Sequence, residues 1–320
     1  MKKISIVTPC FNEEQSIKDA YDAVRDIFKG MPNYQREHIF CDNASTDRTL
    51  AILRDIAAQD PCVKVIVNAR NFGPLRNTYN GVMASSGDAV LLFLPADLQD
   101  PPELLPRFVE LWEQGYEIVY GIRAGREEGL VMRFTRSVYY RLLTKFSEVV
   151  VPPGVGDFQL VDRRVVEAMR QICDGYPFMR MMTFECGGQS IGVPYLWRAR
   201  KKGISKNRLL ALFEQGMNGL VSFTTAPVRL GLFGGFLLAS VSLFYALANL
   251  FIGLIFYGRL AEPGITTIIV ALFFFGGFQL FFLGIIGEYV LAIYGQVRDK
   301  PVLFERERIN FPAPDAPRGN

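Results

Sequence analysis

The chain has 320 residues, 50% of them hydrophobic, and a formal net charge of +3. This length suits one large or two smaller domains, and so small a charge gives no reason to expect nucleic acid as a partner. The five cysteines form no CxxC pair and indicate neither a disulfide framework nor a zinc site. A single histidine, His38, excludes a histidine-based metal cluster. The apolar run at residues 4–7 is too short for a signal peptide.

Strand and helix patterns alternate along the first part of the chain. Short apolar runs predict strands at 4–8, 38–41, 63–67, 89–94 and 117–120. Amphipathic segments predict helices at 14–28, 46–58 (with Ser45 as N-cap), 75–85 and 103–114. This alternation predicts an α/β fold with a mostly parallel sheet and helices on both faces. Beyond Gly121 the rhythm is lost, and we expect a helix at 133–150, an extended segment at 158–161 and a helix at 163–173.

The chain changes character near Arg229. No charged residue occurs from 230 to 258 or from 263 to 287, and each run is long enough to span a bilayer as a helix. Basic residues flank the pair of runs on both outer sides, which places both termini in the cytosol. We expect transmembrane helices at about 230–257 and 264–288, and a disordered tail at 312–320.

Polar groups follow four of the predicted strands. They lie in PCFNE (9–13), CDNASTD (41–47), NFG (71–73) and PADLQDPPE (95–103). Because the carboxyl ends of parallel strands meet at one edge of a sheet, we expect these segments to form one rim. Phe11 can stack on a base, Glu13 and Asp42 can accept hydrogen bonds from a ribose or a base, and Asp97 can bind a hard divalent cation. The chain has neither a P-loop nor a GxGxxG motif.

These motifs resemble those of glycosyltransferase family 2, whose domain has the GT-A fold. PCFNE is similar to the family's PxYNE, DNASTD to its DDGSxD, and PADLQDPPE to the DADLQDPPE of the dolichyl-phosphate mannose synthase branch. RKKGISK at 200–206 resembles that branch's RxxGxSK acceptor loop. GEY at 287–289, IY at 293–294 and DKP at 299–301 resemble the end of bacterial GtrB-type polyprenyl-phosphate glucosyltransferases. Asn43, Ala44 and Pro95 depart from the pattern, where the family has Asp, Gly and Asp.

The resemblance implies an enzyme that moves a sugar, glucose from UDP-glucose, onto polyprenyl phosphate in one inverting displacement. It implies a cytosolic GT-A domain at 1–203, a juxtamembrane amphipathic segment at 204–228, two transmembrane helices within 229–292 and a cytosolic tail at 293–320. The protein would lie in the inner (plasma) membrane as a homo-oligomer such as a tetramer, with the lipid bilayer as a partner. Its cofactor would be Mg²⁺ or Mn²⁺.

The motifs and the resemblance together define the candidate site residues. They are Pro9, Phe11 (tyrosine in the family), Glu13, Asp42, Asn71 and Ala96 for the nucleotide; Asp97 and Gln99 for the metal; Asp157 and Asp97 for catalysis; and Arg123, Arg126, Arg200, Ser205 and Lys206 for the acceptor phosphate.

Several alternatives stay open. The six basic residues within 198–208 suit phosphate binding or attraction to anionic lipid, and Arg123 and Arg126 suit a phosphate or a solvated surface. Residues 209–221 fit a helix on the membrane or one packed on the catalytic domain. Three roles stay open for Asp157, which lies in a Gly-rich segment predicted to be a loop: general base, orienting group or turn residue.

For the whole chain, three competing hypotheses remain. The first is the same reaction with GDP-mannose or another nucleotide sugar. The second is a processive polysaccharide synthase, whose QxxRW motif the chain lacks. The third is a membrane scaffold with a degenerate site, to which Asn43 and Pro95 point.

Overall fold

A computed structural model of the chain describes residues 1–124, 152, 154–172, 177–197, 233–237, 240, 241, 244, 264–297 and 303–312. The chain forms two compact units. The first contains Met1–Ser137, Val149–Asn207 and Asp299–Asn320, and the second contains Val138–Glu148 and Arg208–Arg298.

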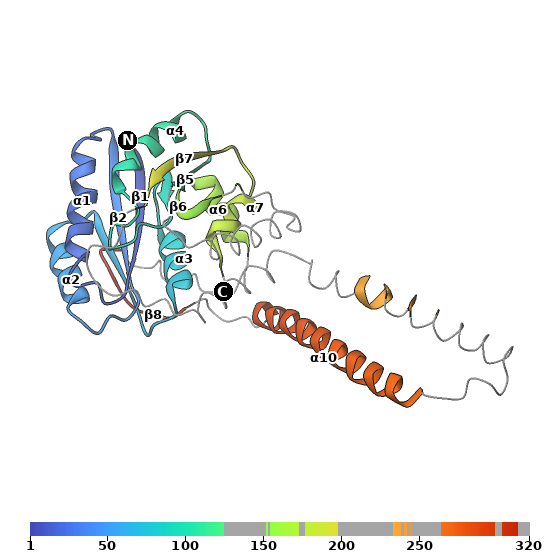
Figure 1. Cartoon of the computed structure of the whole chain (residues 1–320). Coiled ribbons are helices and arrows are strands. Elements are labelled where there is room, and N and C mark those ends of the chain that lie inside the picture. The colour runs from blue at the N-terminus through green and yellow to red at the C-terminus, as the bar shows by residue number, and fades with distance from the viewer. Residues whose placement is uncertain are drawn as a thin grey trace, which may run out of the picture. The chain divides into compact units, whose positions relative to one another are not determined.

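Among the described residues, the first unit has one eight-stranded sheet with the order β7-β5-β6-β4-β1-β2-β3-β8 (Figure 1). The strands are β1 (Lys2–Cys10), β2 (Tyr34–Asp42), β3 (Val63–Asn68), β4 (Ala89–Leu91), β5 (Ile118–Ala124), β6 (Val155–Asp162), β7 (Ser190–Leu196) and β8 (Glu305–Ile309). The ladder β4-β1-β2-β3 is parallel, but β6 runs antiparallel to β4 and β5, and β8 runs antiparallel to β3. The sheet is therefore mixed: the expected parallel pairing holds for its centre and for β5 with β7, but not where β6 and β8 join.

Helices cover both faces of this sheet, as expected. They are α1 (Ile17–Lys29), α2 (Thr49–Gln59), α3 (Pro74–Ala84), α4 (Leu105–Glu113), α6 (Arg163–Gln171) and α7 (Met179–Glu185). Figure 1 shows α1 and α2 on one side of β1 and β2, with α3 on the other. Helix α3 lies so close that a Cβ on Gly81 would be 2.4 Å from the sulfur of Cys41 and 2.7 Å from the Val7 side chain. A residue larger than glycine would push α3 off the sheet.

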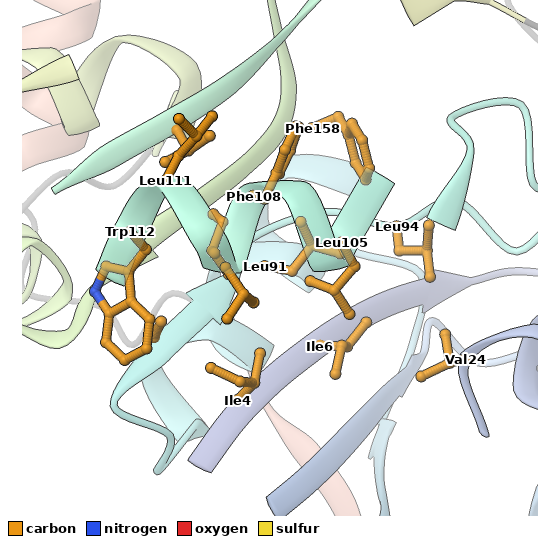
Figure 2. Close-up of a cluster of buried hydrophobic side chains, with 14 of the residues drawn as sticks. Ile4, Ile6, Val24, Leu91, Leu94, Leu105, Phe108, Leu111, Trp112 and Phe158 are labelled. Atoms are coloured by element: carbon orange, nitrogen blue, oxygen red, sulfur yellow. The ribbon is translucent and has the colours of Figure 1, made fainter. Parts of the chain in front are cut away.

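The hydrophobic core between the sheet and the helices α1 and α4 contains side chains from one face of α4. Leu105, Phe108 and Trp112 of α4 point onto Ile4 and Leu91 of the sheet (Figure 2). All five are less than 9% exposed. Burying each such side chain contributes about 1.5–3 kcal/mol to folding. This packing holds in place the 3₁₀ turn Pro102–Leu104, which overlaps the end of the last candidate rim segment.

Several element boundaries differ from the predicted ones. Helix α2 begins at Thr49, because Asp47 Oδ1 accepts the Thr49 N–H at 2.9 Å, so Ser45 is not its N-cap. Strand β4 ends at Leu91 rather than 94, since Leu92 N–H bonds to Gln159 O and Leu94 N–H to Val7 O outside a regular ladder. The segment of Asp157 is not a loop but part of β6.

Strand β8 lies in the segment that we expected to be a tail. Its sequence ERERI has no apolar alternation, which is why it was not predicted as a strand, and an edge strand can keep its polar side chains in solvent. Glu307 Oε2 accepts from Arg54 Nη2 and Glu305 Oε1 from Asn80 Nδ2, both at 2.5 Å. The chain after the apolar region therefore returns to the sheet and covers the edge of β3.

In the second unit, one described helix is long and apolar enough to cross a membrane. This is α10 (Gly264–Val297), which matches the expected span at 264–288 and continues past it, with its most apolar part at Phe274–Leu291. Its 34 residues make a helix about 51 Å long, against roughly 30 Å of hydrocarbon. Large apolar side chains on it are exposed, among them Leu272, Leu280 and Leu291. In the expected first span, the described residues 233–237, 240, 241 and 244 are helical. The expected helix at 133–150 and the expected amphipathic segment at 204–228 lie outside the described residues.

His38 is a buried core residue on β2. Its Nε2 lies 2.9 Å from the Thr8 hydroxyl, and its Nδ1 has no hydrogen-bond partner among the described residues. Desolvation, together with the positive charge of Arg36, lowers the pKa of His38 to about 3. The ring is therefore neutral in the folded protein, and it has no chemical role in the site described below.

We expect the His38 ring to remain neutral between pH 8 and pH 5. The unfolded chain takes up this proton near pH 6.5 and the folded chain near 3, so the free energy of unfolding should fall as the pH drops below about 6.5. Because the chain has one histidine, NMR of protein labelled with ¹³C-histidine follows this ring alone. The same sample in denaturant is the control and should titrate near 6.5. A midpoint at that same pH in the folded protein would contradict a buried ring.

Candidate active site

The loops that follow β1 and β2 are tied to each other. Asn12 N–H donates to the Ser45 hydroxyl at 3.0 Å, and Asn12 Oδ1 accepts the Thr46 N–H at 2.8 Å. Glu13 N–H donates to the Thr49 hydroxyl at 2.8 Å. These bonds, and the register that pairs Cys10 with Asp42, bring the loop of Pro9, Phe11 and Glu13 beside the loop that follows Asp42, as the motifs predicted.

Asp42 is a buried carboxylate at the end of β2. Its Oδ2 accepts the Ser45 N–H at 3.2 Å, while its buried Oδ1 has no hydrogen-bond partner among the described residues. Burial raises the pKa of Asp42, and the hydrogen bonds from Ser45 only partly offset this. The unpaired Oδ1 has the chemistry to accept an N–H or O–H group of a nucleotide, but in this structure the atom is buried.

Asn43, one of the departures from the family pattern, holds the loop after β3. Its Nδ2 donates to Asn71 Oδ1 at 2.9 Å, and its Oδ1 accepts from Asn68 Nδ2 and Phe72 N–H, both at 3.0 Å. Asn71 Oδ1 also accepts the Gly73 N–H at 2.9 Å. An aspartate at 43 could accept the two bonds but could not donate to Asn71. The amide is therefore the group that this loop requires.

Three of the loops at this edge contain a non-glycine residue in the left-handed region. These are Asn12 (φ 56°), Ala44 (φ 60°) and Leu98 (φ 54°). For Ala and Leu this conformation costs about 1–2 kcal/mol each. Such strain persists only where the surroundings over-determine it, and it clusters at functional sites.

The loop after β4 carries the predicted metal ligands. Asp97 Oδ1 accepts the Gln99 N–H at 3.2 Å, and Pro95 O accepts the Leu98 N–H at 3.0 Å. Asp97 and Gln99 are both half-buried. Ala96, predicted to contact the nucleotide, is 4% exposed and belongs to the same buried hydrophobic cluster as Cys10.

The oxygen donors of Asp97 and Gln99 suit Mg²⁺ or Mn²⁺. Within the described ranges, no group of three His, Cys, Asp or Glu side chains could hold a metal ion. A cation at this loop would therefore need ligands beyond these two side chains, such as the oxygens of a diphosphate.

Asp157 on β6 forms a two-pronged ion pair with Arg180 of α7. Arg180 Nη2 donates to Asp157 Oδ2 at 2.6 Å, and Nε donates to Oδ1 at 3.2 Å. Burial alone would raise the pKa of Asp157, but the positive charges of Arg180 and Arg123 outweigh it and lower the pKa below its usual value. Asp157 is therefore an ionised carboxylate and a weak base.

Arg123, predicted to bind the acceptor phosphate, pairs with a buried carboxylate. Its Nη2 donates to Asp100 Oδ1 and Oδ2 at 3.2 and 3.1 Å, and its Nε donates to Tyr195 Oη at 3.0 Å. The Asp157–Arg180 pair and the group of Arg123, Asp100 and Tyr195 lie near each other, since the positive charge of Arg123 also acts on Asp157.

Sequence reasoning missed Arg180 and Tyr195, and Asp100 was not among its candidate site residues. Asp100 belongs to the PADLQDPPE motif and could have been found there. No local pattern marks Arg180 or Tyr195, which α7 and β7 bring to the site. Of the predicted acceptor residues, Arg126, Arg200, Ser205 and Lys206 lie outside the described residues.

Residues 5–170 match the family model for glycosyl transferase family 2. The chain belongs to glycosyltransferase family 2. This glycosyltransferase is 35% identical over 300 residues to the SfII prophage-derived bactoprenol glucosyl transferase of Shigella flexneri, covering 93% of this chain and 96% of that one. It is 33% identical over 300 residues to the uncharacterized glycosyltransferase YkcC of Bacillus subtilis (strain 168), covering 93% and 91%. The resemblance seen in the motifs is thus confirmed, and the protein is an enzyme.

Among solved structures, the glycosyltransferase is similar to glucosyl-3-phosphoglycerate synthase from Mycobacterium tuberculosis, crystallised with Mn²⁺, UDP and phosphoglyceric acid. The identity is 23% and the TM-score 0.49, and the match covers 69% of this chain and 78% of that one.

We expect Asn43→Asp, which restores the family's residue, to destabilise this protein by about 1–3 kcal/mol. The loss follows because the introduced carboxylate and Asn71 Oδ1 are both acceptors and would face each other without a donor. The midpoint of thermal unfolding in detergent measures this loss of stability. Asn33→Asp, the same change at an exposed position, is the control and should leave the midpoint unchanged. Equal midpoints for the two variants would contradict the role of the amide.

Proposed function

We propose that this glycosyltransferase moves glucose from UDP-glucose onto polyprenyl phosphate and releases UDP. The observation that carries the proposal is the similarity, over 93% of the chain, to relatives named bactoprenol glucosyl transferase, because bactoprenol is a polyprenol. The apolar helix α10 supports a lipid acceptor. The unpaired acceptor of Asp42 and the oxygen donors of Asp97 and Gln99 support a nucleotide diphosphate donor.

The reaction needs little proton transfer. An oxygen of the acceptor phosphate attacks C1 of glucose, the bond from C1 to the diphosphate oxygen breaks, and UDP leaves with the electron pair, so that C1 inverts. The second pKa of a phosphate monoester is about 6, so the nucleophile is mostly a dianion at neutral pH. The protein must instead bring together two negatively charged reactants, which calls for positive charge with a fixed direction.

Arg180 and Arg123 are suited to supply that charge. Both are half-buried, and Asp157 and Asp100 hold their guanidinium groups through paired hydrogen bonds. The lowered pKa of Asp157 makes it a poor general base, which favours an orienting role for this carboxylate. Arg126, Arg200, Ser205 and Lys206 remain candidates for contacts with the acceptor phosphate.

A divalent cation, Mg²⁺ or Mn²⁺, would offset the charge that grows on the departing diphosphate. Asp97 would be its main protein ligand and Gln99 a second. Pro95 replaces the other family aspartate, so the diphosphate would supply more of the coordination.

The proposal includes a setting in the membrane. Helices at about 230–257 and 264–288 would span the inner (plasma) membrane, with both termini and the catalytic unit in the cytosol. There the catalytic unit would have access to nucleotide sugars. A homo-oligomer, such as a tetramer, stays a prediction from the family resemblance.

Transfer of label from UDP-[¹⁴C]glucose to a chloroform-soluble product in the presence of polyprenyl phosphate tests the function. We expect activity with Mn²⁺ or Mg²⁺ and none in excess chelator. Asp97→Asn should lower kcat/KM at least about a hundredfold, the scale of a lost catalytic group. Asp55→Asn, at an exposed position, is the control. Full turnover in excess chelator would refute metal dependence. If label is transferred only from GDP-mannose, the donor is GDP-mannose and not UDP-glucose.

Asp157→Asn should lower kcat at least about a hundredfold at every pH from about 7 to 9, because the variant loses the charge that orients Arg180. Binding of UDP-glucose should be unchanged, since the nucleotide contacts lie at the other loops. Arg180→Gln should give a similar loss. A pH–rate profile of Asp157→Asn that rejoins wild type near pH 8 would instead identify a general base, because the acceptor is fully ionised there.

A further inference from the structure

Asp100 is a fully buried carboxylate that pairs with Arg123 but would not itself touch a reactant. It follows Asp97 by three residues, and its side chain is 1% exposed. It accepts hydrogen bonds from Arg123 Nη2 and from the hydroxyl of Tyr195. A buried charge is tolerated only when it is paired and hydrogen-bonded, so this carboxylate depends on both partners.

Arg123 and Tyr195 also bond to each other. They are direct Cα partners in the parallel pairing of β5 and β7, and Arg123 Nε donates to Tyr195 Oη at 3.0 Å. The three side chains therefore form a closed triangle in which Arg123 donates to Tyr195 and Asp100, and Tyr195 donates to Asp100. Burial and the nearby Asp100 charge raise the pKa of Tyr195 well above its usual value, so its hydroxyl remains a donor.

The backbone makes room for this triangle. A Cβ on Gly121 would lie 2.5 Å from Tyr195 Cε1 and 3.1 Å from Phe158 Cδ1. The Tyr195 ring packs edge-on against Phe158, with centroids 5.8 Å apart. Glycine at 121 thus lets the ring take the position from which its hydroxyl reaches Asp100.

The triangle restrains most of the guanidinium group of Arg123. Its Nε and Nη2 are bonded, and its central carbon lies 5.3 Å from the centroid of the Trp197 ring. None of its hydrogen bonds to described residues uses Nη1. A Cβ on Gly156, beside Asp157, would lie 3.7 Å from Arg123 Nε, which places Arg123 between the metal loop and the Asp157–Arg180 pair.

We propose that Asp100 and Tyr195 are positioning residues that hold Arg123 so that its Nη1 edge binds the acceptor phosphate. The inference rests on the proposed function and goes beyond it, because it assigns to two buried residues the direction of the acceptor-binding arginine. It also gives the loop of Asp97 a mechanical link to the acceptor side, since Asp100 belongs to that loop.

Tyr195→Phe removes one hydroxyl and keeps the ring. We expect it to raise the KM for polyprenyl phosphate about tenfold, the scale of a lost hydrogen bond to a charged group. The KM for UDP-glucose and the Mn²⁺ concentration for half-maximal activity should change less than twofold. Tyr120→Phe is the matched control, the same change at another buried tyrosine, on β5, and it should leave all three values unchanged.

A double-mutant cycle separates positioning from a merely structural role. Arg123→Lys keeps a positive charge near Asp100 but removes the fork that Tyr195 holds. In this background, Tyr195→Phe should change the acceptor KM less than twofold, because its effect acts through the guanidinium. The same tenfold effect in both backgrounds, or an unchanged acceptor KM in Tyr195→Phe, would overturn the inference. If Tyr195→Phe does not fold, Asp100→Asn takes its place in the cycle. A wild-type protein that transfers no glucose to polyprenyl phosphate would refute the proposed function, and the inference with it, whereas an additive cycle in an active enzyme would refute the inference alone.

Discussion

The parallel ladder β4-β1-β2-β3 is the constraint on which the candidate site depends. Each of these strands leaves the sheet at its carboxyl end, so the loops that follow them crowd along one edge. Their backbone groups have no ladder partners and must be satisfied by side chains from the neighbouring loops. Asn12, Ser45, Thr49 and Asn43 fill this role. These bonds between loops fix the positions of Asp42 and Asp97 at this edge of the sheet.

The other half of the site is organised by two carboxylate–arginine pairs. Asp157 with Arg180 and Asp100 with Arg123 each neutralise part of the positive charge that a phosphate acceptor would seek. In return, the two pairs fix the orientation of the guanidinium groups, because a planar guanidinium held by two hydrogen bonds cannot rotate away. For a reaction between two anions, a fixed cation lowers the barrier more effectively than a mobile one, since no reorganisation is needed as charge develops.

The departures from the family motifs have different physical consequences. At position 43 the amide supplies a donor that an aspartate lacks, and the loop after β3 is built around it. At position 44 the alanine carries a left-handed backbone that glycine would adopt without strain. At position 95 the proline accepts a turn bond from Leu98 but offers no carboxylate, so Asp97 is the one aspartate of that loop able to hold a cation at its tip. These departures leave in place the carboxylates proposed for the site, Asp42, Asp97 and Asp157.

Local sequence patterns determined the central strands, the helices between them, the long apolar helix and the rim motifs. They did so because apolar periodicity, turn residues and motif spacing report energies that act within a few residues. Only the tertiary structure decided that β6 inserts antiparallel between β4 and β5, which turns the supposed loop of Asp157 into a strand facing Arg180. It also decided that the charged segment ERERI closes the edge of β3, and that Tyr195 and Asp100, 95 residues apart, share a hydrogen bond. Such pairings depend on which sheet edge is open and on what lies across it once the chain has folded, and no pattern within one segment records that.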